Sequence, residues 1–171
     1  MLGEHEREIR GCLAKGAHDV QIDFTEGRLA IKLDPSGWLL NGFIELINLA
    51  LSRFSKRECR LIGVHTCPGS DRDSTHSADV DYAELLPRLF ELEVGNFYIA
   101  LAGEPDRIRV LKIIRQCLRP GRRVFIGVVS PIDPRVESPE EIRDRTPEAA
   151  KIYSGRTTRN HRRLRFLTIL R

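Results

Sequence analysis

The sequence has no long hydrophobic run. Its first residues, MLGEHEREIR, lack the apolar core of a signal peptide, and no later stretch is apolar over the roughly 18 residues that a membrane span requires. Its four cysteines, Cys12, Cys59, Cys67 and Cys117, are widely spaced and form no CxxC pair. These absences argue against a secreted, disulfide-rich or membrane-spanning protein, and they predict a cytoplasmic protein with reduced thiols.

A glycine-rich dinucleotide loop is also missing, which disfavours a doubly wound nucleotide-binding sheet. The composition is otherwise ordinary, because 41% of the residues are hydrophobic and 30% are charged. This balance is typical of a globular domain with a single core.

Acidic residues are missing from the end of the chain. Residues 154–171, SGRTTRNHRRLRFLTILR, contain six arginines and no acid. Without them the chain has 22 basic and 24 acidic residues, so the net charge of +4 becomes −2. A basic tail can bind nucleic acid. The alternative is that residues 152–171 are not part of the evolved domain, which would then comprise residues 1–151.

Short apolar segments alternate with helical patterns along residues 1–151. The segments are rich in β-branched or aromatic residues, which is typical of strands buried in a parallel sheet. They are DVQIDF (19–24), RLIGVHT (60–66), NFYIALA (96–102) and RVFIGVV (123–129). Helical periodicity follows or precedes each one. The alternation predicts an α/β fold, a partial (β/α)8 TIM barrel of about four β/α units, because a complete barrel needs roughly 200–250 residues.

Reactive side chains follow each of the four predicted strands. They are Asp23 and Glu26 after the first, His65 and Cys67 after the second, Glu104 after the third, and Asp133, Arg135 and Glu137 after the fourth. Because active sites of β/α barrels lie at the carboxyl ends of the strands, we expect these residues to lie at one site.

The His65-x-Cys67 pair suits a zinc ion. Side chains two residues apart point to the same side of an extended backbone, and imidazole and thiolate are typical zinc ligands. The alternative is a buried free cysteine beside a structural histidine. Asp23 ends a buried strand, where a carboxylate is costly unless it has a partner. The partner is either a bound ligand or Arg28.

Three stretches resemble the C-terminal catalytic barrel of the cobalamin-independent methionine synthase family, within the uroporphyrinogen decarboxylase/methionine synthase-like superfamily. They are VQIDFTEGRLAIKLDPSG, IGVHTCPGSDRDSTHSADVDYAELLPRLFELEVGNFYIALAGEPDR and VFIGVVSPIDPRVESPEEIRDR. The resemblance covers residues 5–151 and implies a zinc-dependent S-methyltransferase of methionine biosynthesis. In this family zinc activates the thiol of homocysteine, which takes a methyl group from methyltetrahydrofolate.

The resemblance assigns roles to individual residues. His65 and Cys67 match the family's zinc ligands, and Asp23 matches the aspartate that binds the amino group of homocysteine, so Asp23 and the nearby Glu26 are the expected substrate-binding residues. Ala100 and Leu101 occupy the position of the family's glutamate ligand, and Glu104 is the later candidate. SPIDP replaces the family's DIHSP, which carries its proton-donating histidine. A different methyl donor or thiol acceptor therefore fits equally well.

The tail departs most from the family, whose members continue with a sequence like YIPVEQLGTTDDCGFSPF. One DNA stretch can encode both endings. ATATATTCCGGT read from its first base gives Ile152-Tyr-Ser-Gly, and read one base later it begins Tyr-Ile-Pro; suitable codons extend the match through the cysteine. We therefore expect that residues from about 152 are out of frame and lie outside the fold. The missing zinc ligand would be in the other frame.

These observations predict an incomplete zinc methyltransferase, inactive alone, which could form a homo-oligomer to cover its open barrel edges. Two alternatives stay open. One is a metal-free β/α binding module completed by dimerisation. The other is a basic-tailed nucleic-acid binder, which the frame hypothesis disfavours.

Overall fold

The computed structural model describes residues 2–69, 77–130, 133–154 and 163–167. Helices and strands alternate along these residues. The helices are α1 (Leu2–Ala14), α2 (Glu26–Leu33), α3 (Trp38–Leu51), α4 (Lys56–Cys59), α5 (Tyr82–Leu89), α6 (Arg107–Cys117) and α7 (Pro139–Ser154); the strands are β1 (Val20–Asp23), β2 (Ile62–Thr66), β3 (Asn96–Ala100), β4 (Arg123–Gly127) and β5 (Arg163–Leu167).

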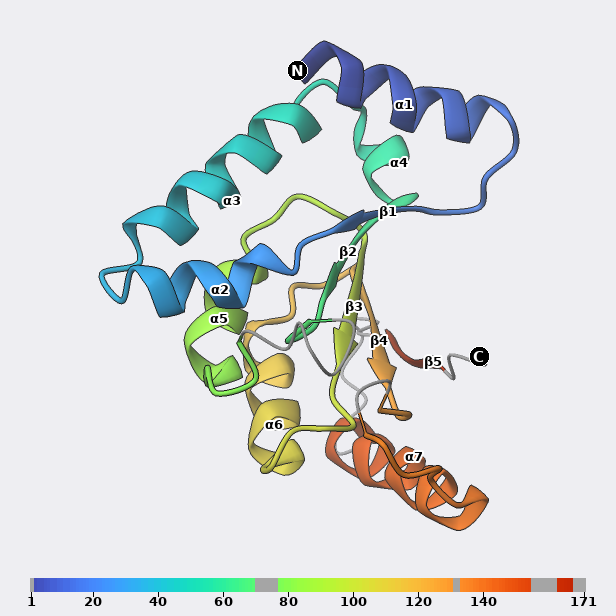
Figure 1. The fold of residues 1–171 in the computed structure, drawn as a ribbon. Coiled ribbons are helices and arrows are strands. Elements are labelled where there is room, and N and C mark those ends of the chain that lie inside the picture. The colour runs from blue at the N-terminus through green and yellow to red at the C-terminus, as the bar shows by residue number, and fades with distance from the viewer. Residues whose placement is uncertain (1, 70–76, 131–132, 155–162, 168–171) are drawn as a thin grey trace.

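The strands form one parallel sheet in sequential order, β1-β2-β3-β4-β5 (Figure 1). Each predicted apolar segment contains one of the first four strands, so the α/β class with a parallel sheet is confirmed. Sequential parallel strands need a crossover on each connection, and helices provide it here. The carboxyl ends of the strands therefore lie at one edge of the sheet.

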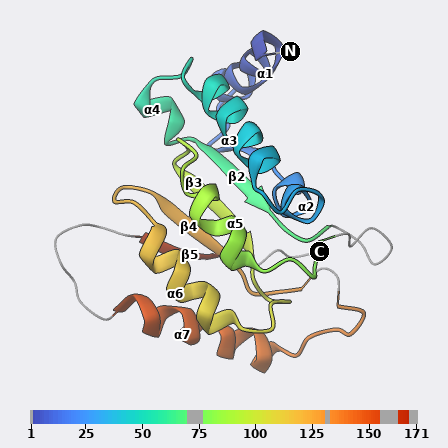
Figure 2. The same cartoon turned by 90° about the vertical axis from the view of Figure 1, so that its left-hand side faces the viewer.

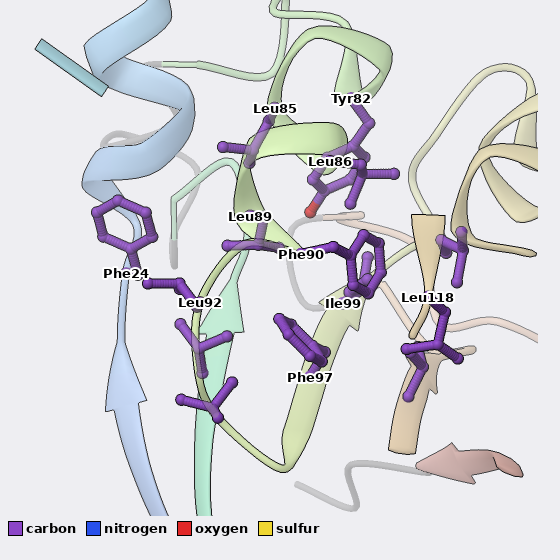
Figure 3. Packing of buried hydrophobic residues seen from close by; sticks show 14 of the residues in the cluster. Phe24, Tyr82, Leu85, Leu86, Leu89, Phe90, Leu92, Phe97, Ile99 and Leu118 are labelled. Carbon is purple, nitrogen blue, oxygen red and sulfur yellow. The ribbon is translucent and has the colours of Figure 1, made fainter. Parts of the chain in front are cut away.

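Helices α2, α3, α5 and α6 lie on one side of the sheet (Figures 1 and 2). The strand side chains that face them are apolar and buried, among them Val64, Phe97, Ile99, Val124 and Ile126. This alternation is the period of two expected of a strand with one face against a core. Figure 3 shows the packing between α5 and β3, where the rings of Phe90 and Phe97 lie 4.7 Å apart.

Most side chains of the opposite sheet face are half-buried or exposed, and Asn96 is buried there. It carries Gln21, Asp23, His65, Tyr98 and Phe125, and we call it the open face. The rings of Tyr98 and Phe125 stack on it with centroids 4.6 Å apart. The Tyr98 hydroxyl also donates a hydrogen bond to Asp19, just before β1.

Local signals explain several element ends. A capping box begins α7, because the Glu141 backbone N–H donates to Ser138 Oγ (3.2 Å) and the Ser138 N–H donates to Glu141 Oε2 (2.7 Å). Gly16, which follows the end of α1, has φ = 90°, a left-handed conformation that favours glycine. The short helices α2 and α4 were not predicted.

Part of the basic tail lies in the sheet. Residues Arg163–Leu167 pair in parallel with β4, with Arg163 opposite Arg123. The sequence had predicted that the whole tail lies outside the fold. A strand at the edge of a sheet presents unpaired backbone N–H and C=O groups, and an extended segment can pair with them whatever its origin.

Candidate functional site

The carboxyl ends of β1 and β2 bring Asp23 and His65 together. These residues are direct partners in the β1–β2 register. His65 Nδ1 lies 2.9 Å from Asp23 Oδ1, and the two side chains are 24% and 67% exposed. In the tautomer that this hydrogen bond requires, Nδ1 carries the proton and Nε2 has a free lone pair. The sequence predicted both residues for one site, and the structure places them in contact.

Cys67 follows β2 and is 5% exposed. Burial raises the pKa of its thiol, although the backbone N–H of Gly69 and the charge of Arg28 partly offset this effect. The thiol is therefore neutral at pH 7 in this environment. A bound cation would favour the thiolate, because metal coordination deprotonates a cysteine.

Glu104 pairs with Arg28 rather than with another candidate ligand. Arg28 Nη1 donates to Glu104 Oε1 at 2.7 Å, and the two side chains are 0% and 11% exposed. Burial raises the pKa of Glu104, and Arg28 offsets part of this shift. The alternative pairing of Asp23 with Arg28 is wrong, because Asp23 bonds His65 and Arg28 lies buried beside Glu104.

A hollow lies at the carboxyl ends of β2, β3 and β4, and the residues directly after Cys67 form part of its wall. Its empty volume is about 410 Å³, including space that opens to solvent. Its walls are small or apolar apart from Glu104 and Ser130; the others are Pro68, Gly69, Ala78, Ala100, Ala102, Gly103 and Val129. The place agrees with the rule that parallel sheets bind ligands at the carboxyl ends of their strands.

Glu26 is exposed on the first turn of α2. A carboxylate there interacts favourably with the positive end of the helix, which gives Glu26 a structural role whether or not it binds substrate. Ala100 ends β3 and lines the hollow, and neither it nor Leu101 offers a metal ligand.

The donor atoms at this site can be compared with those that zinc requires. His65 and Cys67 offer an imidazole nitrogen and a sulfur, which are zinc-ligand types. A histidine that binds zinc usually donates its other ring N–H to a carboxylate, and Asp23 is such a carboxylate beside His65. Within the described ranges, however, no three His, Cys, Asp or Glu side chains gather closely enough to hold a metal ion. The donor types thus fit zinc, and the described residues supply fewer than the three protein ligands of a catalytic site.

Arg28 and Glu137 have structural roles at this site that the sequence did not predict, although it placed Glu137 after the fourth strand. Glu137 is 3% exposed, accepts the Ser130 backbone N–H at 2.9 Å and pairs with Arg145, so it fixes the segment that ends at the hollow. Arg28 sits in a short helix that was not predicted. An arginine within an otherwise apolar helical pattern, GRLAI, was the one available signal.

Comparison of the chain with protein-family models, with curated proteins and with solved structures finds no match in any of the three. Among the described residues, no helix is both long and apolar enough to cross a bilayer.

Proposed function

We propose that His65 and Cys67 are two ligands of a zinc site in a β/α-barrel S-methyltransferase of the methionine synthase type. The observation that carries the proposal is the 2.9 Å contact between His65 Nδ1 and Asp23 Oδ1. A carboxylate that holds one nitrogen of a histidine leaves the other aimed at a metal, which is the usual arrangement in zinc proteins. Cys67 follows at the spacing that suits a second ligand.

The proposed substrates are a homocysteine-like thiol and a methyl donor such as methyltetrahydrofolate. Bound zinc would supply Lewis acidity, which lowers the pKa of a coordinated thiol. Asp23 is 67% exposed, so its carboxylate can receive a substrate ammonium group while Oδ1 holds His65. The hollow beside Cys67 offers space for part of either substrate. The four cysteines are free thiols, which suits the reducing cytoplasm.

The position of β5 supports the idea that another ligand belongs in the tail. In the proposed reading frame shifted by one base, the cysteine codon would straddle the codons of Leu164 and Arg165. Both residues lie in β5, beside β4. A cysteine there would lie in the same parallel sheet as β2, which precedes Cys67.

The test compares zinc content in four proteins after purification with zinc and gel filtration. One is the chain as printed, and another has residues from 152 replaced by YIPVEQLGTTDDCGFSPF. The third carries His65→Ala in that restored chain, and His18→Ala, just before β1, serves as the matched control. We expect the restored chain to retain zinc, the printed chain to retain little, and His65→Ala to lose it. A restored chain without zinc, or a His65→Ala variant that keeps it, overturns the proposal.

Sequencing the DNA and the transcript across codons 145–171 tests the frame directly. A shifted frame that reads DDCGF supports the enzyme, whereas its absence favours a real basic tail. In that case salt-sensitive duplex binding that is lost on deletion of residues 154–171 would identify a nucleic-acid binder.

The open face favours one other candidate, a metal-free β/α module that dimerises. Parallel sheets are normally covered on both faces, and the described helices cover one. Sedimentation of the printed chain as a dimer, with no zinc in either the wild type or His65→Ala, would support this candidate over the enzyme.

A further inference from the structure

Arg28 is a fully buried cation that joins three segments around the site. Its side chain is 0% exposed on α2. Nη1 donates to Glu104 Oε1 (2.7 Å), and Nη2 donates to the carbonyl oxygens of Ala78 (3.1 Å) and Val80. One guanidinium thus connects the helix after β1 with the segment before α5 and with the turn after β3.

A second line of contacts leads from Arg28 to the backbone beside Cys67. The guanidinium carbon lies 4.3 Å from the ring centroid of Tyr82, which is itself buried. The Tyr82 hydroxyl donates to the carbonyl oxygen of Thr66 at 3.1 Å. Thr66 is the residue before Cys67, so the position of the guanidinium and that of the Cys67 backbone depend on the same ring.

The residues held by Arg28 are walls of the hollow. Both Ala78 and Glu104 line it, together with Pro68 and Gly69, which follow Cys67 directly. Arg28 itself does not line the hollow and stands behind these walls. Ser77 adds a hydrogen bond to the same wall, because its Oγ donates to the Pro68 carbonyl oxygen at 3.2 Å.

Packing alone does not explain a cation in this place. A buried ion pair stabilises a fold weakly or not at all compared with apolar residues of the same volume, because both charges lose their hydration. Arg28 Nε is also buried with no hydrogen-bond partner among the described residues. What a guanidinium does provide is a planar set of donors that fixes several oxygens in one geometry.

We propose that Arg28 is the positioning residue of the strand-end site: it fixes Glu104, the Ala78–Val80 backbone and, through Tyr82, the backbone at Cys67. The inference deepens the proposed function, since that function names the site which Arg28 would shape. It does not require that zinc binds. Loss of the guanidinium should make the backbone around Cys67 locally more mobile, while the rest of the hydrophobic core stays packed.

The experiment measures alkylation of individual cysteines by N-ethylmaleimide at one fixed pH with EDTA present, and it reads each cysteine by peptide mass spectrometry. Cys59, which is half-buried and ends α4 before the start of β2, is the internal reference. The variants are Arg28→Met, which keeps the length and removes every donor, and Arg28→Lys, which keeps the charge and loses the planar fork. Arg88→Met is the matched control, because Arg88 is 51% exposed on α5.

We expect Arg28→Met to raise the rate at Cys67 relative to Cys59 by about tenfold or more, as for a local opening. Arg28→Lys should give a smaller rise, and Arg88→Met none. An unchanged Cys67-to-Cys59 ratio in a folded Arg28→Met or Arg28→Lys variant overturns the inference. An equal rise at both cysteines also overturns it, since it indicates global loosening.

If Arg28→Met does not fold, Arg28→Lys alone decides by the same ratio. The outcomes separate this inference from the proposed function. A raised Cys67 ratio without zinc retention in the restored chain leaves Arg28 as the positioning residue of a metal-free site. Zinc retention with an unchanged ratio removes the role of Arg28 and leaves the enzyme.

Discussion

Removal of Glu104 should destabilise the fold more than removal of any exposed acid, because it leaves Arg28 as an uncompensated buried charge. The guanidinium is 0% exposed and its carboxylate partner 11% exposed, so neither group is screened well by water. Breaking such a buried pair from one side costs about 3–5 kcal/mol. Glu104→Ala is the direct perturbation.

The effect is measurable by urea unfolding followed by circular dichroism. With a denaturant dependence of about 2 kcal/mol per molar urea, this loss lowers the unfolding midpoint by about 1.5–2.5 M. The double variant Arg28→Met/Glu104→Ala should cost less than the two single changes together, because it leaves no unpaired charge. We expect a coupling free energy of about 2–3 kcal/mol.

Two other substitutions test whether the buried charge of Arg28 causes this loss of stability. Glu104→Gln should cost less than Glu104→Ala, because burial raises the pKa of Glu104 and the amide still accepts a hydrogen bond without carrying a charge. Asp144→Ala removes an acid from an exposed pair, in which Arg143 and Asp144 are 67% and 68% exposed, and should cost about 0–1 kcal/mol. If Glu104→Ala costs no more than Asp144→Ala, Arg28 is not held as a buried ion.

Three further changes test the core, the backbone and the cap. Phe97→Ala should lower the free energy of unfolding, measured in urea, by about 3–5 kcal/mol, since Phe97 is 0% exposed. Leu33→Ala, at a site 69% exposed, should change this free energy little. Gly95→Ala should destabilise by about 1–3 kcal/mol, because its Cβ would lie 2.5 Å from the backbone before β2; Gly42→Ala, with nothing within 4 Å in α3, should stabilise by about 0.5–1 kcal/mol. The Arg135 guanidinium, followed by the Ser138 backbone N–H at the start of α7, lowers the pKa of Glu141 to about 2. The stability that ionised Glu141 provides is therefore complete above the ordinary pKa near 4.5 and is lost as the pH falls toward 2. Glu141→Gln should make the thermal unfolding temperature less dependent on pH over that range.

The sequence was sufficient to predict the first four strands and insufficient to predict β5 or the pairing around Arg28. An apolar, β-branched run such as RLIGVHT is stable as a buried strand, so β2 and the reactive side chains at its carboxyl end could be predicted. The partner of Arg28 could not, because Asp23 is near in sequence while Glu104 is 76 positions away. A local pattern cannot rank two carboxylates when the choice depends on which strand ends become neighbours. The helix that carries Arg28 was missed for a related reason, since its eight residues are too few to show a clear period.

The proposed zinc site and the open face together predict that metal binding and assembly are coupled. Asp23 and His65 lie on the open face, and Asp23 is 67% exposed there. A second subunit or further strands over this face would remove water from the pair, and electrostatic interactions become stronger when water is excluded. Any ligand that binds the covered state more tightly must, by mass action, favour that state. Zinc should therefore increase self-association of the restored chain in sedimentation, and His65→Ala should abolish this increase. Equal association with and without zinc, in a chain that retains the metal, would show that the open face has no part in the site.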